Sequence, residues 1–183
     1  MSVQIQHGGE LTEQEFRKFT LYTCNSNNAL DDKARAKILG FPDNIRIAPG
    51  AIVRIDDNNH IGCNAYIGLY SYINGDVSIG DNVFIGPHAS IVASNHLYSP
   101  ETNSFSDRTD LHRGKVVIEK GVWLTSGVVI TPGCTIGQCA LICSNAVVTN
   151  NVAPYAIMAG APAQQIGKID PESGQYHWNK KDK

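Results

Sequence analysis

The sequence predicts a mainly β fold, a parallel β-helix built from six-residue repeats. An aliphatic residue returns at every sixth position in two runs, and a small or β-branched residue commonly stands four positions after it. The first run is Ile55, Ile61, Ile67, Ile73, Ile79, Ile85 and Ile91, and the second is Ile118, Leu124, Ile130, Ile136, Ile142 and Val148. A period of six matches neither an α-helix nor an ordinary alternating strand. It suits stacked coils whose flat faces each use one hexapeptide and point the aliphatic residue into a continuous core.

A second regularity concerns the residue that follows the aliphatic, which is often glycine. This is the case for Gly62, Gly68, Gly80, Gly86 and Gly137. We expect glycine to relieve crowding where the backbone turns tightly. Three hexapeptides per coil would then make a triangular prism.

Residues 1–44 precede the repeats and are predicted to form a helical segment. A first helix is expected from residue 12 to about 22, because its opening threonine and Glu15 form a capping-box pattern. A second is expected over 31–39, with Gly40 as its stop signal.

The domain in between, residues 45–169, is predicted to be the β-helix, interrupted by one protruding loop at 97–115. That loop is polar and rich in turn residues, and the spacing from Ile91 to Ile118 is not a multiple of six, which indicates an insertion. Loops of this length without structure of their own are usually functional or disordered. Residues 170–183 are expected to be a C-terminal tail.

Composition and charge indicate which binding partners and which cellular compartment to expect. The 183 residues carry a net charge of −2 with a pI near 6.3, which gives no electrostatic case for nucleic acid. No apolar run is long enough for a membrane helix, and the N-terminus lacks a secretory pattern, so a cytoplasmic location is expected. The five cysteines form no C-x-x-C pair, and we expect reduced structural thiols rather than disulfides or metal ligands.

Several motifs together resemble one known family. They are the hexapeptide runs, Ser94-Asn95-His96 at the start of the insertion, Val122-Trp123-Leu124, and the closing segment from Pro154 to Ala163. Over about residues 50–169 the sequence is similar to the maltose/galactoside O-acetyltransferase branch of the hexapeptide acyltransferases. The resemblance implies a left-handed winding of the β-helix, acetyl-CoA as co-substrate and a saccharide or other small acceptor. It also implies a homotrimer with active sites between subunits.

By the same resemblance, His96 corresponds to the histidine that activates the acceptor hydroxyl. An alcohol is a weak nucleophile at neutral pH, and imidazole can take its proton as it attacks the thioester. Asn95 and His112 are candidates for acceptor contact. Tyr66 and Asn74 stand at acceptor positions where the family often has asparagine and an acidic residue, so the sugar preference of the best-known members does not carry over.

The positions expected to contact the coenzyme also follow from the resemblance. Trp123 corresponds to a tryptophan beside the pantetheine arm. Lys168 is expected to replace the family's usual basic residue at the nucleotide end, where Gln164 and Gly167 now stand. Four small polar residues complete the set, namely Ser126, Ser144, Thr149 and Asn150.

Three other functions remain open from the sequence. The chain could acetylate the nitrogen of an amino sugar or another small acceptor, in which case the histidine would matter less. It could be a metal hydratase like the γ-type carbonic anhydrases, but His88, His96 and His112 lack the spacing of a zinc site, and no metal is expected. It could also be a non-catalytic scaffold, since exposed aromatics such as Tyr66, Phe84 and Trp123 favour a trimer with or without chemistry.

Overall fold

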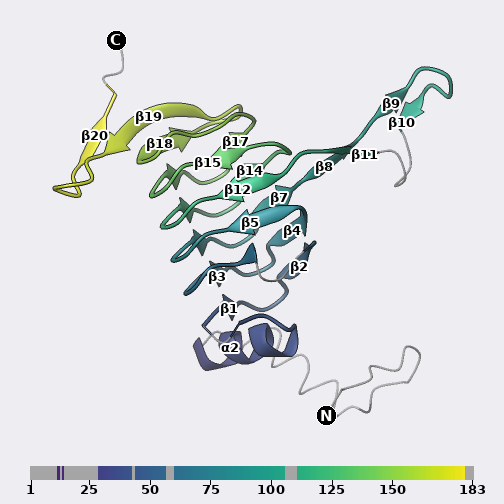
Figure 1. Cartoon of the computed structure of the whole chain (residues 1–183), viewed down its shortest axis with the longest axis horizontal. Coiled ribbons are helices and arrows are strands. Elements are labelled where there is room, and N and C mark those ends of the chain that lie inside the picture. The colour runs from purple at the N-terminus through teal and green to yellow at the C-terminus, as the bar shows by residue number, and fades with distance from the viewer. Residues whose placement is uncertain are drawn as a thin grey trace.

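The computed structural model describes residues 12, 14, 29–42, 44–56, 60–105 and 111–179. The chain forms a β-solenoid of about five turns with one N-terminal helix at its base (Figure 1). The predicted mainly β, coil-stacked architecture is therefore confirmed. Among the described residues, no helix has the length and apolar character needed to cross a membrane.

Helix α2 (Ala29–Ile38) closes the lower end of the solenoid. It begins two residues before the predicted start, so Asp31 and Asp32 fall in its first turn, where carboxylates stabilise the positive end of the helix dipole. Gly40 adopts a positive φ of 83° and ends the helix as predicted. The first predicted helix lies outside the described residues, apart from its positions 12 and 14.

The coils contribute strands to three parallel sheets, and each coil passes from sheet A to sheet B to sheet C. The solenoid strands of sheet A are β1 (Arg46–Ile47), β3 (Tyr66–Ile67), β6 (Phe84–Ile85), β13 (Trp123–Leu124), β16 (Leu141–Ile142) and β18 (Ala156–Ala159). Sheet B contains β2 (Ile52–Ile55), β4 (Tyr72–Gly75), β7 (Ser90–Val92), β14 (Val129–Ile130) and β17 (Val147–Val148). Sheet C contains β5 (Val77–Ile79), β12 (Val116–Ile118) and β15 (Thr135–Ile136).

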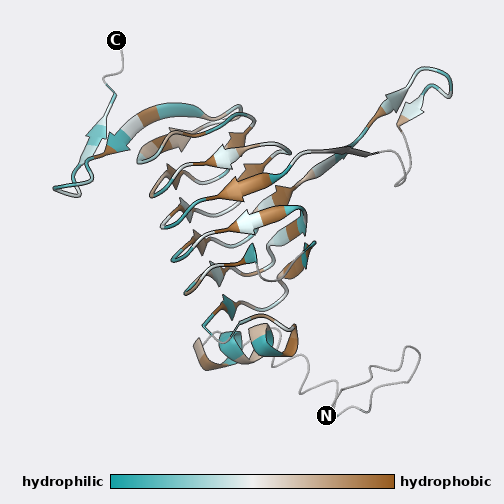
Figure 2. Ribbon diagram, in the orientation of Figure 1, coloured by the Kyte–Doolittle hydropathy of each residue, from teal (hydrophilic) through white to brown (hydrophobic). Residues whose placement is uncertain are grey.

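The repeated aliphatic residues line the interior, as predicted. Ile67, Ile85 and Leu124 pair in register up sheet A and are completely buried, and brown apolar positions recur along the coils in Figure 2. Ile55, the first member of the predicted column, packs against the core but does not stand in the register of the others. Val53 pairs with Ile73, whereas Ile55 lies opposite a glycine. The spacing from Val53 to the next buried aliphatic, Ile61, exceeds a hexapeptide, so the regular register begins only there.

Glycine after the aliphatic residue has a different cause from the one expected. A Cβ on Gly86 would lie 2.7 Å from the carbonyl carbon of Thr125 in the coil above, and Gly68 and Gly80 are equally crowded. The tight turn lies two residues further on, where His88 and Gly127 have positive φ values of 59° and 70°. Glycine is thus required here by the close stacking of coils, and the corner itself accepts other residues.

The insertion is not the structureless loop that the sequence suggested. It contains β8 (Ser94–His96), paired antiparallel with β11 (Leu111–Arg113), and β9 (Tyr98–Ser99), paired antiparallel with β10 (Ser104–Phe105). These strands project from the corner between sheets B and C as a long arm (Figure 1).

The C-terminal segment is also more ordered than a tail. After β18, the chain reverses into β19 (Gln164–Ile169) and then β20 (Tyr176–Trp178), both antiparallel additions to sheet A. Asp170, in the turn between them, accepts hydrogen bonds from the main chain and hydroxyl of Ser173, each at 2.7 Å, which lowers the pKa of its carboxyl.

Candidate active site

A cavity of about 440 Å³ opens at the corner between sheets B and C, where the insertion leaves the solenoid. Its walls come from the ends of β2, β4 and β7 and from the residue that precedes β12. The lining residues are Arg54, Asp56, Asn74, Gly75, Asp76, Ala93, Ser94 and Lys115. Stacking brings these groups together, because each coil passes through the same corner one layer above the last.

The predicted base, His96, lies on β8 at the root of the arm and is exposed. Two residues before it, Ser94 lines the cavity. Asn95 pairs with His112 across the β8–β11 ribbon, and His96 pairs with Leu111. The structure therefore brings the backbone positions of Asn95, His96 and His112 together beside the cavity, and Asn74 forms part of its wall.

Tyr66 lies elsewhere, on the outer face of sheet A. Its ring stacks on Phe84 with centroids 4.8 Å apart, and Phe84 meets Trp123 edge to face at 6.4 Å. The guanidinium of Arg46 lies 5.1 Å from the Tyr66 ring centroid. Partial burial, followed by the charge of Asp32, raises the pKa of Tyr66. Within one chain, Tyr66 is thus separated from Asn74, which is on sheet B.

The residues predicted to contact the coenzyme divide into two groups. Trp123 and Lys168 belong to sheet A, and Ser126 and Ser144 occupy the corner between sheets A and B. Thr149 and Asn150 instead follow β17 at the corner between sheets B and C, the corner that holds the cavity. One chain does not bring the two groups onto a common edge.

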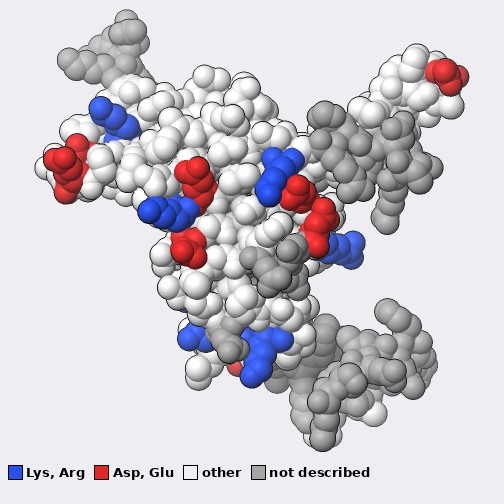
Figure 3. All heavy atoms as spheres, in the orientation of Figure 1, with Lys and Arg blue, Asp and Glu red and all other residues white. Residues whose placement is uncertain are grey.

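Sequence reasoning missed four charged residues of the cavity wall: Arg54, Asp56, Asp76 and Lys115. Lys115 Nζ lies 3.8 Å from Asp76 Oδ1, and the two residues belong to neighbouring coils. Figure 3 shows basic and acidic side chains close together where the arm leaves the solenoid. These four residues could have been found from the sequence by one signal. Each stands near the end of a sheet B strand or beside the insertion.

Neither metal ligands nor disulfides gather in the part of the chain that the structure describes. No three His, Cys, Asp or Glu side chains there are placed to hold an ion, and His88 lies at the A/B corner, away from His96. Cys63, Cys134, Cys139 and Cys143 are free thiols, and burial raises the pKa of Cys143. Cys24 lies outside the described residues.

Known proteins share both the repeat and the wider fold. Residues 60–93 match the bacterial transferase hexapeptide family (six repeats). The chain is 30% identical to galactoside O-acetyltransferase of Escherichia coli K12 over 176 residues, covering 92% of this chain and 85% of that protein. A maltose O-acetyltransferase structure from Clostridium difficile 630 superposes with a TM-score of 0.64 at 26% identity and covers 84% of both chains.

A more distant structure shares the fold alone. A variant of AntD, an N-acyltransferase from Bacillus cereus in complex with dTDP-4-amino-4,6-dideoxyglucose and coenzyme A, superposes with a TM-score of 0.62 at 20% identity, covering 71% of this chain and 73% of that one. The extent of the galactoside O-acetyltransferase match, together with the hexapeptide solenoid, establishes that this chain belongs to the hexapeptide-repeat acetyltransferases.

Proposed function

We propose that this enzyme transfers the acetyl group of acetyl-CoA to a hydroxyl of a sugar or saccharide acceptor, with His96 as the general base. The observation that carries the proposal is the cavity of about 440 Å³ at the root of the arm, two residues from His96, in a chain that matches a galactoside O-acetyltransferase along most of its length. The polar and charged lining of that cavity suits an acceptor rich in hydroxyl groups.

In this reaction, His96 takes the proton of the acceptor hydroxyl as its oxygen attacks the thioester carbonyl. A new carbon–oxygen bond forms, the carbon–sulfur bond breaks, and the imidazolium returns the proton to the departing CoA sulfur. Base assistance of this kind contributes about 10²–10⁴-fold. No covalent acyl-enzyme is needed, so none of the thiols has to act as a nucleophile.

A homotrimer explains why the predicted coenzyme residues occupy two edges. If the outer face of sheet A on one subunit lies near the B/C corner of its neighbour, Trp123 and Ser144 of one chain face Asn150 and His96 of the other. Phe84 and Trp123 are 43% and 46% exposed and contact each other, and an exposed apolar patch of this kind usually marks an interaction surface. The coenzyme would then lie between subunits. The AntD variant, which shares this fold, is in complex with coenzyme A, and this supports a coenzyme site on a solenoid of this type.

The test measures CoA release from acetyl-CoA across a panel of sugars and amino sugars, with wild type, His96→Ala and His88→Ala. His88 is the matched control, because it is also an exposed histidine of the solenoid but lies at another corner. We expect acceptor-dependent release that falls at least about 100-fold in His96→Ala and stays within a factor of two in His88→Ala. Unchanged turnover in His96→Ala would exclude it as the base.

The bond formed in the product distinguishes acetyl transfer to oxygen from acetyl transfer to nitrogen. A neutral amine attacks a thioester without strong base help, so an N-acetyltransferase would retain much of its activity in His96→Ala at alkaline pH. Mass spectrometry of the acetylated amino sugar, before and after mild base hydrolysis of esters, assigns the bond. We expect an ester.

A further inference from the structure

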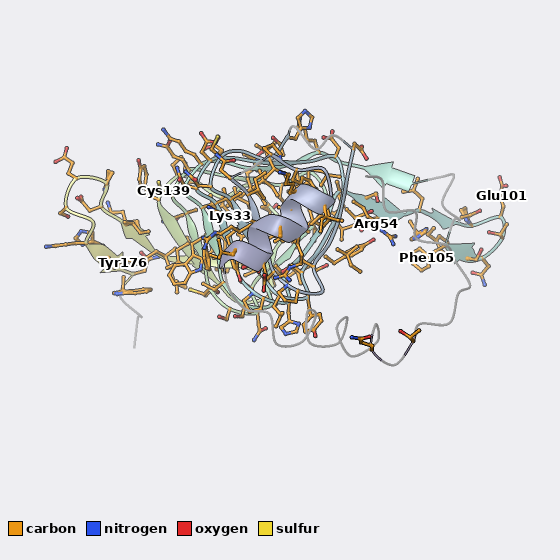
Figure 4. All side chains as sticks on the ribbon, turned by 90° about the horizontal axis from the view of Figure 1, so that it is seen from below. Lys33, Arg54, Glu101, Phe105, Cys139 and Tyr176 are labelled. Carbon is orange, nitrogen blue, oxygen red and sulfur yellow. The ribbon has the colours of Figure 1, made fainter. Side chains whose placement is uncertain are left out.

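The cavity at the root of the arm contains an arginine that the proposed sugar chemistry does not use. Arg54 extends from β2 in the lowest layer of the cavity, next to Asn74 in the register of sheet B. Figure 4 shows Arg54 on the side of the solenoid from which the arm projects toward Glu101 and Phe105. Arg54 therefore lies on the side of the molecule that holds the cavity proposed to bind the acceptor.

The two cationic side chains of the cavity differ in whether they have an ion-pair partner. The other cation, Lys115, has Asp76 as its partner at 3.8 Å. The Arg54 side chain forms neither an ion pair nor a hydrogen bond with any residue that the structure describes, although arginine stays charged and offers five donors. A guanidinium on a cavity wall, with no ion-pair partner among the described residues, can bind a planar or tetrahedral anion through two parallel hydrogen bonds.

The remaining polar groups suit the neutral part of such a ligand. Asn74 can donate and accept, and the Asp56 carboxylate accepts hydrogen bonds from hydroxyls. The cavity volume accommodates a small ligand rather than an extended polymer segment.

We propose that the acceptor of this enzyme is an anionic sugar, whose carboxylate or phosphate is bound by Arg54 while its hydroxyls contact Asn74 and Asp56. The proposal rests on the proposed function, in that the same cavity holds the group to be acetylated. It adds the charge class of the substrate, which neither the repeat nor the relatives' names specify.

The experiment compares acceptors that differ only in charge. Galactose, galacturonic acid, galactose 6-phosphate and galactosamine are assayed by CoA release with wild type, Arg54→Met and the control Lys120→Met. Lys120 is also exposed but lies in another corner, after β12. We expect wild type to favour one of the two acids by at least tenfold in kcat/KM. Arg54→Met should remove that preference by raising the KM for the acid, whereas Lys120→Met should retain it.

The two acids identify which anion is recognised, and preference for either supports the proposal. Equal use of galactose, a preference for galactosamine, or an acid preference retained in Arg54→Met would overturn it. Saturation-transfer NMR measures the binding of each acid to the protein without acetyl-CoA. This measurement tests the anion site separately from the proposed transferase function. If no acceptor is acetylated but an acid binds in an Arg54-dependent manner, the transferase function fails and the anion site remains.

Discussion

Arg35 and Ile47 connect the N-terminal helix to the first coil of the solenoid. The guanidinium Nε of Arg35 donates a 2.8 Å hydrogen bond to the main-chain oxygen of Ile47, and its terminal nitrogen pairs with Asp32. Arg35 and Asp32 are largely buried, with side chains 11% and 5% exposed. One arginine thus satisfies a carbonyl on the lowest strand of sheet A and neutralises a buried carboxylate.

We expect Arg35→Met to destabilise the fold by about 3 kcal/mol, because it leaves the Asp32 charge buried without its partner. The free energy of unfolding in urea measures this cost. Lys37→Met, on the exposed side of the same helix, is the control and should change stability by less than about 0.5 kcal/mol. A double variant, Asp32→Asn with Arg35→Met, should recover part of the loss. Equal stability of Arg35→Met and wild type would mean that helix α2 is not anchored through this pair.

The glycines that follow some of the repeated aliphatic residues give a prediction about coil stacking. Gly86→Ala would place its Cβ 2.7 Å from the Thr125 carbonyl carbon, so adjacent coils must separate, at a cost of about 1–3 kcal/mol. Gly133 is a contrasting position, since it has a positive φ of 84° and a Cβ added there would meet no described atom within 4 Å.

Gly133→Asn should therefore be tolerated within about 0.5 kcal/mol, because asparagine already occupies the same position of the hexapeptide at two other corners, at Asn64 and Asn145, each with a φ of 59°. Thermal and urea denaturation of both variants test the pair. If Gly133→Asn proves the more damaging, backbone conformation rather than coil stacking selects these glycines.

The interior was predictable because it depends on local spacing, whereas the cavity was not. Ile67 and Ile85 could be assigned inward from the period alone, since each hexapeptide repeats the same backbone. Val53 could not, because the first coil departs from that period. Arg54, Asp76 and Lys115 lie in separate coils, and the distances between their side chains depend on stacking and on the path of the insertion. No pairwise spacing in the sequence encodes those distances.

Tyr66 leads to a prediction at alkaline pH. Burial raises its pKa, so the folded chain retains this tyrosyl proton after the unfolded chain has lost it. The contribution to stability is complete below the usual tyrosine pKa. It declines as pH rises from that value to the higher value of Tyr66.

Tyr66→Phe should remove this decline, and the phenolate absorbance of the remaining six of seven tyrosines should lose a component that titrates above the usual tyrosine pKa. A spectrophotometric titration and the pH dependence of urea unfolding provide the two measurements. An unchanged titration curve in Tyr66→Phe would show that this hydroxyl is not the one retained.

The aromatic row of Tyr66, Phe84 and Trp123 predicts how the chain assembles. Phe84 is the middle ring and contacts both neighbours, so Phe84→Glu places a charge at the centre of the face proposed to meet the adjacent subunit. We expect wild type to sediment at about three times the 19.8 kDa chain mass, and Phe84→Glu to sediment near a single chain mass. Tyr176→Ser removes an aromatic of similar exposure from β20 and is expected to leave the assembly intact. Because the residues proposed to contact the coenzyme lie on two edges of each chain, the dissociated Phe84→Glu should also lose acetyl-CoA binding, although its circular dichroism matches wild type. A folded Phe84→Glu monomer that still binds acetyl-CoA would place the whole coenzyme site within one subunit.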